Sequence, residues 1–345
     1  MRTALKLLSS CVVLVVTALT STGSTRSAES PARVTMLFRS GSTVVNRVLE
    51  SHGDLFVVED NNHRIVVTDR RGNVKSQIGS IGQGPGELYY PGDLVEAPNG
   101  NLYVLEVRNR RVQIFDQSGQ SLGMFEVQPE ATGMAVDSKG RILLGQPANG
   151  NLVTVYSADG HRISQFGSLR RFSEFYGPKS QPLDRAGRAA INRVHIACDD
   201  SDNVYVAFLG APFWQKYSPT GKLLLERRVD FPDAQRAITE FASNFNAHST
   251  VKFDEDRSAI PYITTGMTID GTKRLVFSVR WDKSWIVSSN LDGTTSRAFP
   301  LEEPNLQVRT LSADGEHRVF AIGAKPGHNN EVYSIEIPLE GSRSR

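Results

Sequence analysis

The chain has 345 residues, with 22% charged residues, 39% hydrophobic residues and a net charge of +2 at pH 7. Arg2 and Lys6 account for this charge, and acids and bases are otherwise mixed along the chain rather than gathered in blocks. The balance argues against nucleic acid as a partner. Beyond the first 24 residues, no stretch has the roughly 18 uninterrupted apolar residues of a membrane helix, so we expect no membrane span.

The N-terminus has the pattern of an export signal. Its charged start is followed by an apolar run, Leu7 to Leu19, that is too short to cross a bilayer. Small residues then predict cleavage near Ser24, which gives a signal peptide over residues 1–24 and a short linker over residues 25–32. A lipoprotein box ending at Cys11 is the alternative, although cleavage there would leave an apolar mature N-terminus. We therefore predict a periplasmic or secreted protein.

Strand-like runs recur six times after the linker, each behind a Gly or Asp/Asn turn. They occupy residues 55–58, 102–105, 142–144, 204–207, 275–278 and 319–322. The turns before them lie about 40–70 residues apart, a spacing that fits the blades of a β-propeller with two enlarged members. We expect these runs to be the inner strands of six blades.

Two more strands follow each run, and the first of them ends in a tight turn closed by glycine. These glycines are Gly72, Gly119, Gly160, Gly221 and Gly293. The sixth repeat has only one more strand, over residues 332–337, whereas Arg33 to Phe38 forms a strand without a blade.

The sequence therefore predicts an all-β, six-bladed β-propeller of four-stranded antiparallel blades, in which the N-terminal strand completes the last blade. The propeller is expected over residues 33–339, followed by a flexible tail at residues 340–345.

One stretch resembles a known repeat. The Gly-rich turn Gly79 to Gly86, the proline Pro91 and the segment Leu102 to Asp116 resemble the NHL repeat, whose strand reads YVAD-x-x-N-x-R-V-x-x-F-D. A weaker copy runs from Phe56 to Asp69. The resemblance implies a six-bladed propeller of the NHL type, in its secreted bacterial form. The Gly-rich turn is not expected to bind phosphate, because no lysine or helix follows it.

An acid, an asparagine and an arginine recur at the same spacing within the two copies. They are Glu59, Asn62 and Arg64 in the first copy, and Glu106, Asn109 and Arg111 in the second. We expect a structural role, in which the acid and the guanidinium pair across a hairpin. The alternative is a ligand-facing rim, because loops at propeller ends carry most binding contacts.

Two insertions, near residues 169–190 and 231–263, enlarge the third and fourth repeats. The second has a capping Asp233 and apolar residues at helical spacing, which predicts a short helix over one end of the propeller. The first is basic and aromatic, which would suit an acidic or sugar-like ligand. The predicted ligand-binding residues are Arg171, Phe172, Tyr176, Arg188, His195, Arg280 and Trp281.

No catalytic set is evident in the sequence. Its seven histidines have no metal-ligand spacing, and His195 is the best single candidate because acids and an asparagine flank it. Cys198 is expected to be a buried thiol rather than a nucleophile. No cofactor is evident.

Two functions remain open. The first is a monomeric binding module that recognises a protein, peptide or glycan of the cell envelope through its channel mouth and long loops. The second is a propeller enzyme, a lyase or a lactonase-like hydrolase, which would need a divalent metal; it rests on fold analogy alone.

Overall fold

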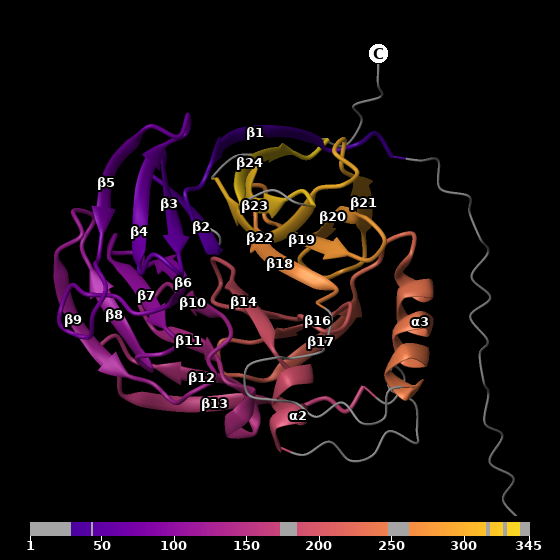
Figure 1. Cartoon of the computed structure of the whole chain (residues 1–345). Coiled ribbons are helices and arrows are strands. Elements are labelled where there is room, and N and C mark those ends of the chain that lie inside the picture. Colours follow the sequence, from indigo (N-terminus) through magenta and orange to yellow (C-terminus); the bar gives the residue numbers. More distant parts are fainter. Residues whose placement is uncertain are drawn as a thin grey trace, which may run out of the picture.

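Six four-stranded antiparallel sheets stand in a ring around a central axis in the computed structural model (Figure 1). The structure describes residues 29–42, 44–172, 185–247, 262–314, 318–326 and 330–338. The predicted six-bladed β-propeller is confirmed.

Blades 1 to 5 are each made of four consecutive strands, the first nearest the axis and the fourth outermost. Blade 1 holds β2 (Val45–Ser51), β3 (Asp54–Glu59), β4 (Arg64–Asp69) and β5 (Val74–Ile78), and blade 2 holds β6 (Pro91–Glu96), β7 (Leu102–Glu106), β8 (Arg111–Phe115) and β9 (Ser121–Glu126). Blade 3 holds β10 (Met134–Val136), β11 (Ile142–Gly145), β12 (Asn151–Tyr156) and β13 (Arg162–Ser168). Blade 4 holds β14 (Val194–Cys198), β15 (Val204–Phe208), β16 (Phe213–Tyr217) and β17 (Leu223–Arg228), and blade 5 holds β18 (Thr264–Ile269), β19 (Arg274–Arg280), β20 (Ser284–Asn290) and β21 (Ser296–Pro300).

Blade 6 joins the two ends of the chain. It combines β22 (Gln307–Ala313), β23 (Arg318–Ala324) and β24 (Glu331–Glu336) with β1 (Arg33–Arg39), which pairs antiparallel to β24 as the predicted closing strand (Figure 1). Because β1 belongs to blade 6 and leads directly into blade 1, the ring has no open edge between its first and last blades.

The innermost strand of each blade is not the one predicted. The strongly apolar runs form β3, β7, β11, β15, β19 and β23, which are the second strands, while β2, β6, β10, β14, β18 and β22 contact one another in sequence around the axis. A second strand has neighbours on both edges and both faces, so it is the most apolar. An innermost strand has one edge free at the axis, and its sequence is more polar and harder to recognise.

The tight-turn glycines fix each blade to the one before it. Gly160 has φ +89°, and a Cβ there would lie 2.3 Å from Cβ of Phe125, on the outer strand of the preceding blade. A Cβ at Gly72, Gly119, Gly221 or Gly293 would lie 2.5 to 2.8 Å from a side-chain atom of Phe38, Ile78, Phe166 or Arg227, respectively. Each glycine therefore supplies both a left-handed backbone and the space that the neighbouring outer strand fills.

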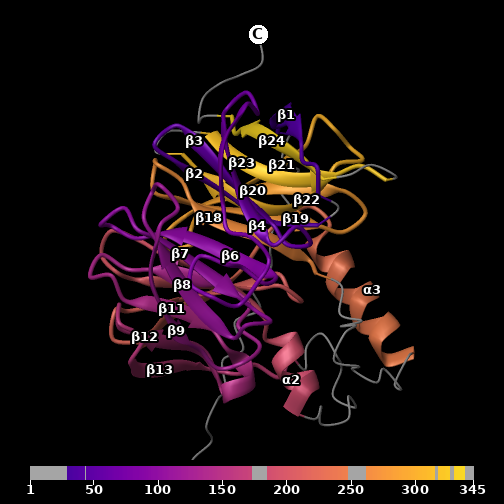
Figure 2. The same cartoon turned by 60° about the vertical axis from the view of Figure 1, so that its left-hand side comes forward.

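All connections between blades lie at the end of the ring where the innermost strands begin, which we call the insertion end. The opposite end, with the hairpins that join first to second and third to fourth strands, we call the turn end. The enlarged connections carry α2 (Arg185–Ile191) and α3 (Ala234–Ala247), which Figure 2 shows on the same side of the ring; a short 3₁₀ turn, η1 (Pro147–Asn149), contacts α2. The helix expected in the second insertion is α3, whereas α2 was not expected.

Helix α3 covers the seam between blades 4 and 5. Ala234 and Ala237 pack with Phe277 and Trp285 of blade 5, whereas Ile238 belongs to the cluster built around blades 3 and 4. The helix is therefore part of the core at this seam. None of the helices in the described part of the chain is long and apolar enough to cross a membrane.

Candidate functional site

Charged and polar side chains from five blades gather near the axis, toward the insertion end. We call Arg47, Asp93, His195, Arg280 and Arg309 the axial cluster. Four of them stand on the innermost strands β2, β6, β14 and β22, and Arg280 ends β19. Because these strands adjoin one another around the axis, residues more than 250 positions apart in the chain stand at the same end of the ring. The side chains interact in two groups, Arg47 with Asp93 and His195, and Arg280 with Arg309.

Asp93 ties three innermost strands together. Its Oδ1 lies 3.5 Å from Nε of Arg47 and its Oδ2 accepts a hydrogen bond from the backbone N–H of Met134 at 2.9 Å. Burial raises the pKa of the Asp93 carboxyl, and the nearby Arg47 charge opposes this effect. Nε of Arg47 is itself buried and has no hydrogen-bond partner among the described residues.

His195 stands on β14, and its ring is held neutral. Burial and then the charge of Arg47 lower its pKa to about 4, while the backbone of Thr264 and Thr265 acts in the opposite direction. Its Nε2 is buried without a hydrogen-bond partner in the part of the chain that the structure describes. At neutral pH the ring is therefore a weak proton acceptor with one nitrogen still available.

Arg280 and Arg309 bring two positive charges together on the blade 5 and blade 6 side of the axis. Burial and the charge of Arg309 lower the pKa of Arg280, whose Nη1 donates a hydrogen bond to Oε1 of Gln307 at 2.9 Å. A guanidinium remains charged in proteins, so this pair is a local concentration of positive charge.

The innermost strands are irregular at this end. The pairing registers of β2, β6, β18 and β22 shift at Asn46, Gly92, Thr265 and Arg309, near the start of each strand. A β-bulge re-aims side chains and is frequent beside functional sites. At the turn end, register shifts also occur, but there they lie between the third and fourth strands of blades 1 to 4, beside the tight turns. Bulges in the innermost strands lie at the insertion end.

The two acid, asparagine and arginine sets form equivalent hairpin clusters. Arg111 Nε lies 2.5 Å from Oε1 of Glu106, which is fully buried, and Asn109 donates to the other carboxylate oxygen at 2.6 Å. In blade 1 the same arrangement joins Glu59 to Asn62 (2.9 Å) and Arg64 (2.7 Å). Burial raises the pKa of Glu59, but hydrogen bonds from Asn62, Ser40 and Arg64 bring it below its ordinary value.

Arg111 also anchors the Gly-rich turn. Its guanidinium donates to the backbone carbonyl groups of Gln83, Gly84 (3.1 Å) and Glu87 (2.8 Å). These contacts give the turn a structural partner within the same blade.

The residues predicted to bind a ligand in the first insertion differ in how exposed they are. Phe172 is 1% exposed and packs against Phe208 and Phe213, so it is a core residue rather than a ligand contact. Arg171 and Arg188 are exposed, and Tyr176 lies outside the described residues.

Asn192 holds the described ends of this insertion together. It is fully buried, accepts a hydrogen bond from the backbone N–H of Arg170 and donates to the carbonyl groups of Arg170 and Arg188. The insertion therefore leaves and returns at one fixed point beside β14.

Trp281 is half-buried beneath the insertions and packs against the clusters of blades 3, 4 and 5. Its indole Nε1 is buried with no hydrogen-bond partner among the residues described. Cys198 ends β14, where burial and then Asp137, Asp202 and Asp199 raise the pKa of its thiol. A protonated thiol is a poor nucleophile, although Cys198 is half-buried and not fully buried as expected.

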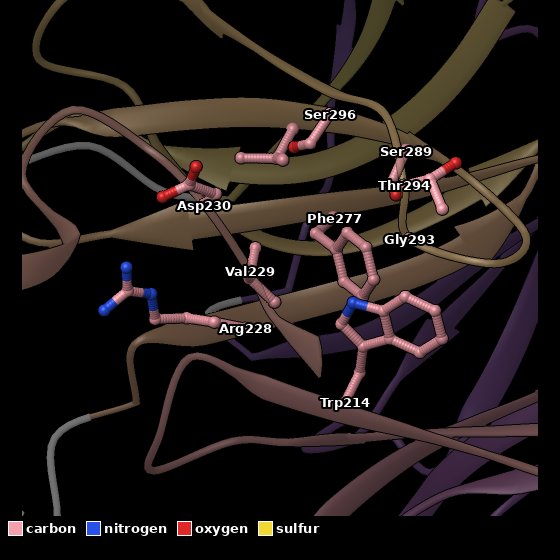
Figure 3. Close-up of a pocket in the computed structure, with 10 residues that line it drawn as sticks. Trp214, Arg228, Val229, Asp230, Phe277, Ser289, Gly293, Thr294 and Ser296 are labelled. Carbon is pink, nitrogen blue, oxygen red and sulfur yellow. The ribbon is translucent and has the colours of Figure 1, made fainter. Parts of the chain in front are cut away.

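A separate pocket of about 220 Å³ lies between blades 4 and 5, away from the axial cluster (Figure 3). Trp214 and Phe277 lie together in it, with Arg228 and Asp230 on one side and Thr294 on the other. Trp214 is 1% exposed, so its ring supports the pocket more than it meets solvent.

Of the axial cluster, His195 and Arg280 are among the residues predicted from the sequence as ligand-binding, whereas Arg47, Asp93 and Arg309 are not. The missed residues stand on innermost strands, which had not been recognised as strands at all. A charged residue in the polar run that precedes each apolar strand is the sequence signal that would have found them.

The residues described contain no group of three or more His, Cys, Asp or Glu side chains placed to hold a metal ion. The donors present at the axis, one carboxylate and one histidine among arginines, do not fit a divalent cation.

Comparisons with known proteins support the fold. A family model described as a 6-bladed beta-propeller matches residues 42–134. Protein brain tumor from Drosophila melanogaster is 28% identical over 123 residues, which is 34% of this chain and only 12% of that protein.

Two solved structures have the same overall architecture. Virginiamycin B lyase from Staphylococcus aureus is 13% identical with a TM-score of 0.52, and the match covers 90% of this chain and 95% of the lyase. A gluconolactonase from Xanthomonas campestris is 13% identical with a TM-score of 0.55, over 89% of this chain and 90% of that enzyme. At this identity the likeness concerns the fold.

Proposed function

We propose that the chain is an exported binding propeller that recognises a protein, peptide or glycan of the cell envelope at the insertion end of its axis. The observation that carries the proposal is the concentration of features at that end: the axial cluster, the bulges of four innermost strands and both enlarged connections. Binding sites in propellers are built from loops at one end of a rigid scaffold, and this chain has elaborated one end.

The proposal includes export and the NHL type. The N-terminal pattern supports cleavage near Ser24, and the stretch from Gly79 to Asp116 supports an NHL-like repeat. Expression of the full chain in a bacterial host, followed by fractionation and N-terminal sequencing, tests export; a mature N-terminus at Thr25 is expected. Retention of the uncleaved chain in the cytoplasm would contradict it.

Binding is tested by screening the folded, purified protein on peptide and glycan arrays. We expect at least one reproducible ligand class whose signal falls when insertion-end residues such as Arg171 and Arg188 are substituted. Blank arrays of both kinds would count against a binding module. Sedimentation of the same material tests the predicted monomer.

A metal-dependent lyase or lactonase is the second candidate, supported by the two structural neighbours that are named as enzymes. Metal analysis of the purified protein separates the two proposals. A stoichiometric divalent ion that stays bound through dialysis would favour the enzyme. Metal-free protein that still binds the ligand found on the arrays would favour the binding module.

A further inference from the structure

We propose that the axial cluster receives carboxylate groups of an acidic peptide segment. The inference rests on the proposed binding function and specifies the chemistry of the ligand. The residues proposed to bind the carboxylates are three arginines, Arg47, Arg280 and Arg309. They come from blades 1, 5 and 6 and stand at one end of the axis.

The charge balance of the cluster favours an anion. Asp93 compensates Arg47, His195 is neutral, and Arg280 and Arg309 leave an excess of two positive charges. Nearby, Asp60 and Arg108 contribute one charge of each sign. Holding Arg280 beside Arg309 is unfavourable for folding, and a carboxylate placed between them would relieve that repulsion.

Guanidinium groups suit a carboxylate in particular, because their planar N–H donors match its two oxygen atoms. Arg309 is exposed and Arg280 is half-buried, and both stand where their strands reach the insertion end. Nε of Arg47 and Nε2 of His195 are buried and have no hydrogen-bond partner among the described residues, although the Arg47 atom lies 3.5 Å from the Asp93 carboxylate. The arrangement has an outer cationic pair and inner polar nitrogen atoms behind it.

A peptide fits better than another polyanion because of the strands that carry these side chains. Each innermost strand pairs with a strand of its own sheet on one edge only. On the other edge, the side chains of Ser312 and Asp93 bond the backbone N–H groups of Glu50 and Met134, and backbone groups not bonded in this way can pair with an extended peptide. The ladder is further disrupted at the bulges of β2, β18 and β22. An extended peptide can satisfy such backbone groups with its own while its acidic side chains or C-terminal carboxylate meet the arginines.

The test uses fluorescently labelled hexaglutamate, with an amidated C-terminus, and titrates it with the full-length protein while anisotropy is recorded. We expect saturable binding that weakens with added salt, and no binding of labelled hexaglutamine. A second arm uses hexaglutamine with a free C-terminus to detect recognition of the terminal carboxylate instead of acidic side chains.

The variant that tests the site is R280Q/R309Q, and its matched control is K273Q, which removes an exposed positive charge at the turn end. The double variant is expected to weaken hexaglutamate binding at least tenfold, and K273Q less than twofold. Both arginines lie outside the core, and circular dichroism checks that the double variant is folded. If it is not folded, R309Q alone replaces it, with an expected loss of hexaglutamate affinity of at least threefold.

Three results would overturn the inference: equal binding by R280Q/R309Q and wild type, no binding of either carboxylate peptide, or stronger binding of a galacturonate hexamer than of hexaglutamate. These results leave the proposed function intact if the arrays give neutral or basic ligands, or acidic glycans. Blank arrays would instead remove the proposed function itself.

Discussion

At the scale of single residues, two hairpins carry the same three side chains and differ in how far water reaches them. The side chain of Arg111 is 8% exposed and that of its partner Glu106 is fully buried, whereas Arg64 is 34% exposed beside the buried Glu59. Removing one partner of a buried ion pair leaves an uncompensated charge away from water, which costs more than the loss of a pair that solvent reaches.

We therefore expect R111A to lower the free energy of unfolding by roughly 3–5 kcal/mol, because it strands the Glu106 carboxylate and frees the Gly-rich turn. R64A should cost only about 1 kcal/mol, because solvent reaches this site and Ser40 and Asn62 still bond Glu59. Urea unfolding of the two variants measures the difference. Equal costs would show that burial does not distinguish the hairpins.

His195 makes stability depend on pH. Its folded-state pKa of about 4 lies below the ordinary value of 6.5, so the unfolded chain takes up a proton first as the pH falls. The contribution of the neutral His195 ring to the free energy of unfolding is fully present above pH 6.5. It decreases by roughly 2–3 kcal/mol as the pH falls toward 4.

H195Q should remove this part of the acid sensitivity, so its stability relative to wild type should rise by roughly 2 kcal/mol between pH 7.5 and pH 4.5. The control is H161Q, because His161 is exposed at the turn end. Urea unfolding at both pH values gives the measurement. A parallel fall for H195Q and wild type would show that the ring is hydrated in the folded protein.

At the scale of elements, the tight turns between third and fourth strands act as contacts between blades. Gly160 and Gly140 both have a left-handed backbone, but a Cβ would meet Phe125 at the first position and nothing within 4 Å at the second. Comparing the two positions separates the loss of stability that a side chain causes through the left-handed backbone from the loss that it causes through steric overlap with Phe125.

G140A should lose about 1 kcal/mol through its backbone alone, whereas G160A should lose roughly 1–3 kcal/mol more because Phe125 must move. Thermal or urea unfolding of the pair tests this prediction. If the two variants are equally stable, the turn does not fix the neighbouring blade.

At the scale of the whole molecule, closure of the ring depends on the pairing of β1 with β24. Thr35 lies opposite Ser334 in this pairing, although the two residues are almost the full length of the chain apart. A covalent bond between them would restrict the unfolded chain without opening the folded ring.

T35C/S334C should therefore form a disulfide under mild oxidation and gain roughly 2–4 kcal/mol relative to its reduced form. Urea unfolding with and without reductant provides the measurement, and the single variants control for disulfides to Cys198. Failure to form the bond, or a less stable oxidised form, would contradict this closure.

The sequence alone determined the repeat number, the turns and the closing strand. Apolar strands and glycine turns are local patterns, because each strand must bury its own faces and each tight turn must reach a left-handed backbone. Leu55 to Val58 and Gly72 could therefore be recognised without knowing their neighbours. The missing strand of the last repeat followed from counting strands, since an unpaired edge is unfavourable.

Only the tertiary structure decided which strands surround the axis and which side chains meet there. Arg47, Asp93 and Arg309 stand on polar innermost strands whose role comes from the neighbouring blades and not from their own periodicity. Phe172 was misassigned for the same reason, because a ring beside two arginines in sequence is covered by Phe208 and Phe213 in space. Burial and charge proximity are properties of the closed ring, so a linear pattern could not contain them.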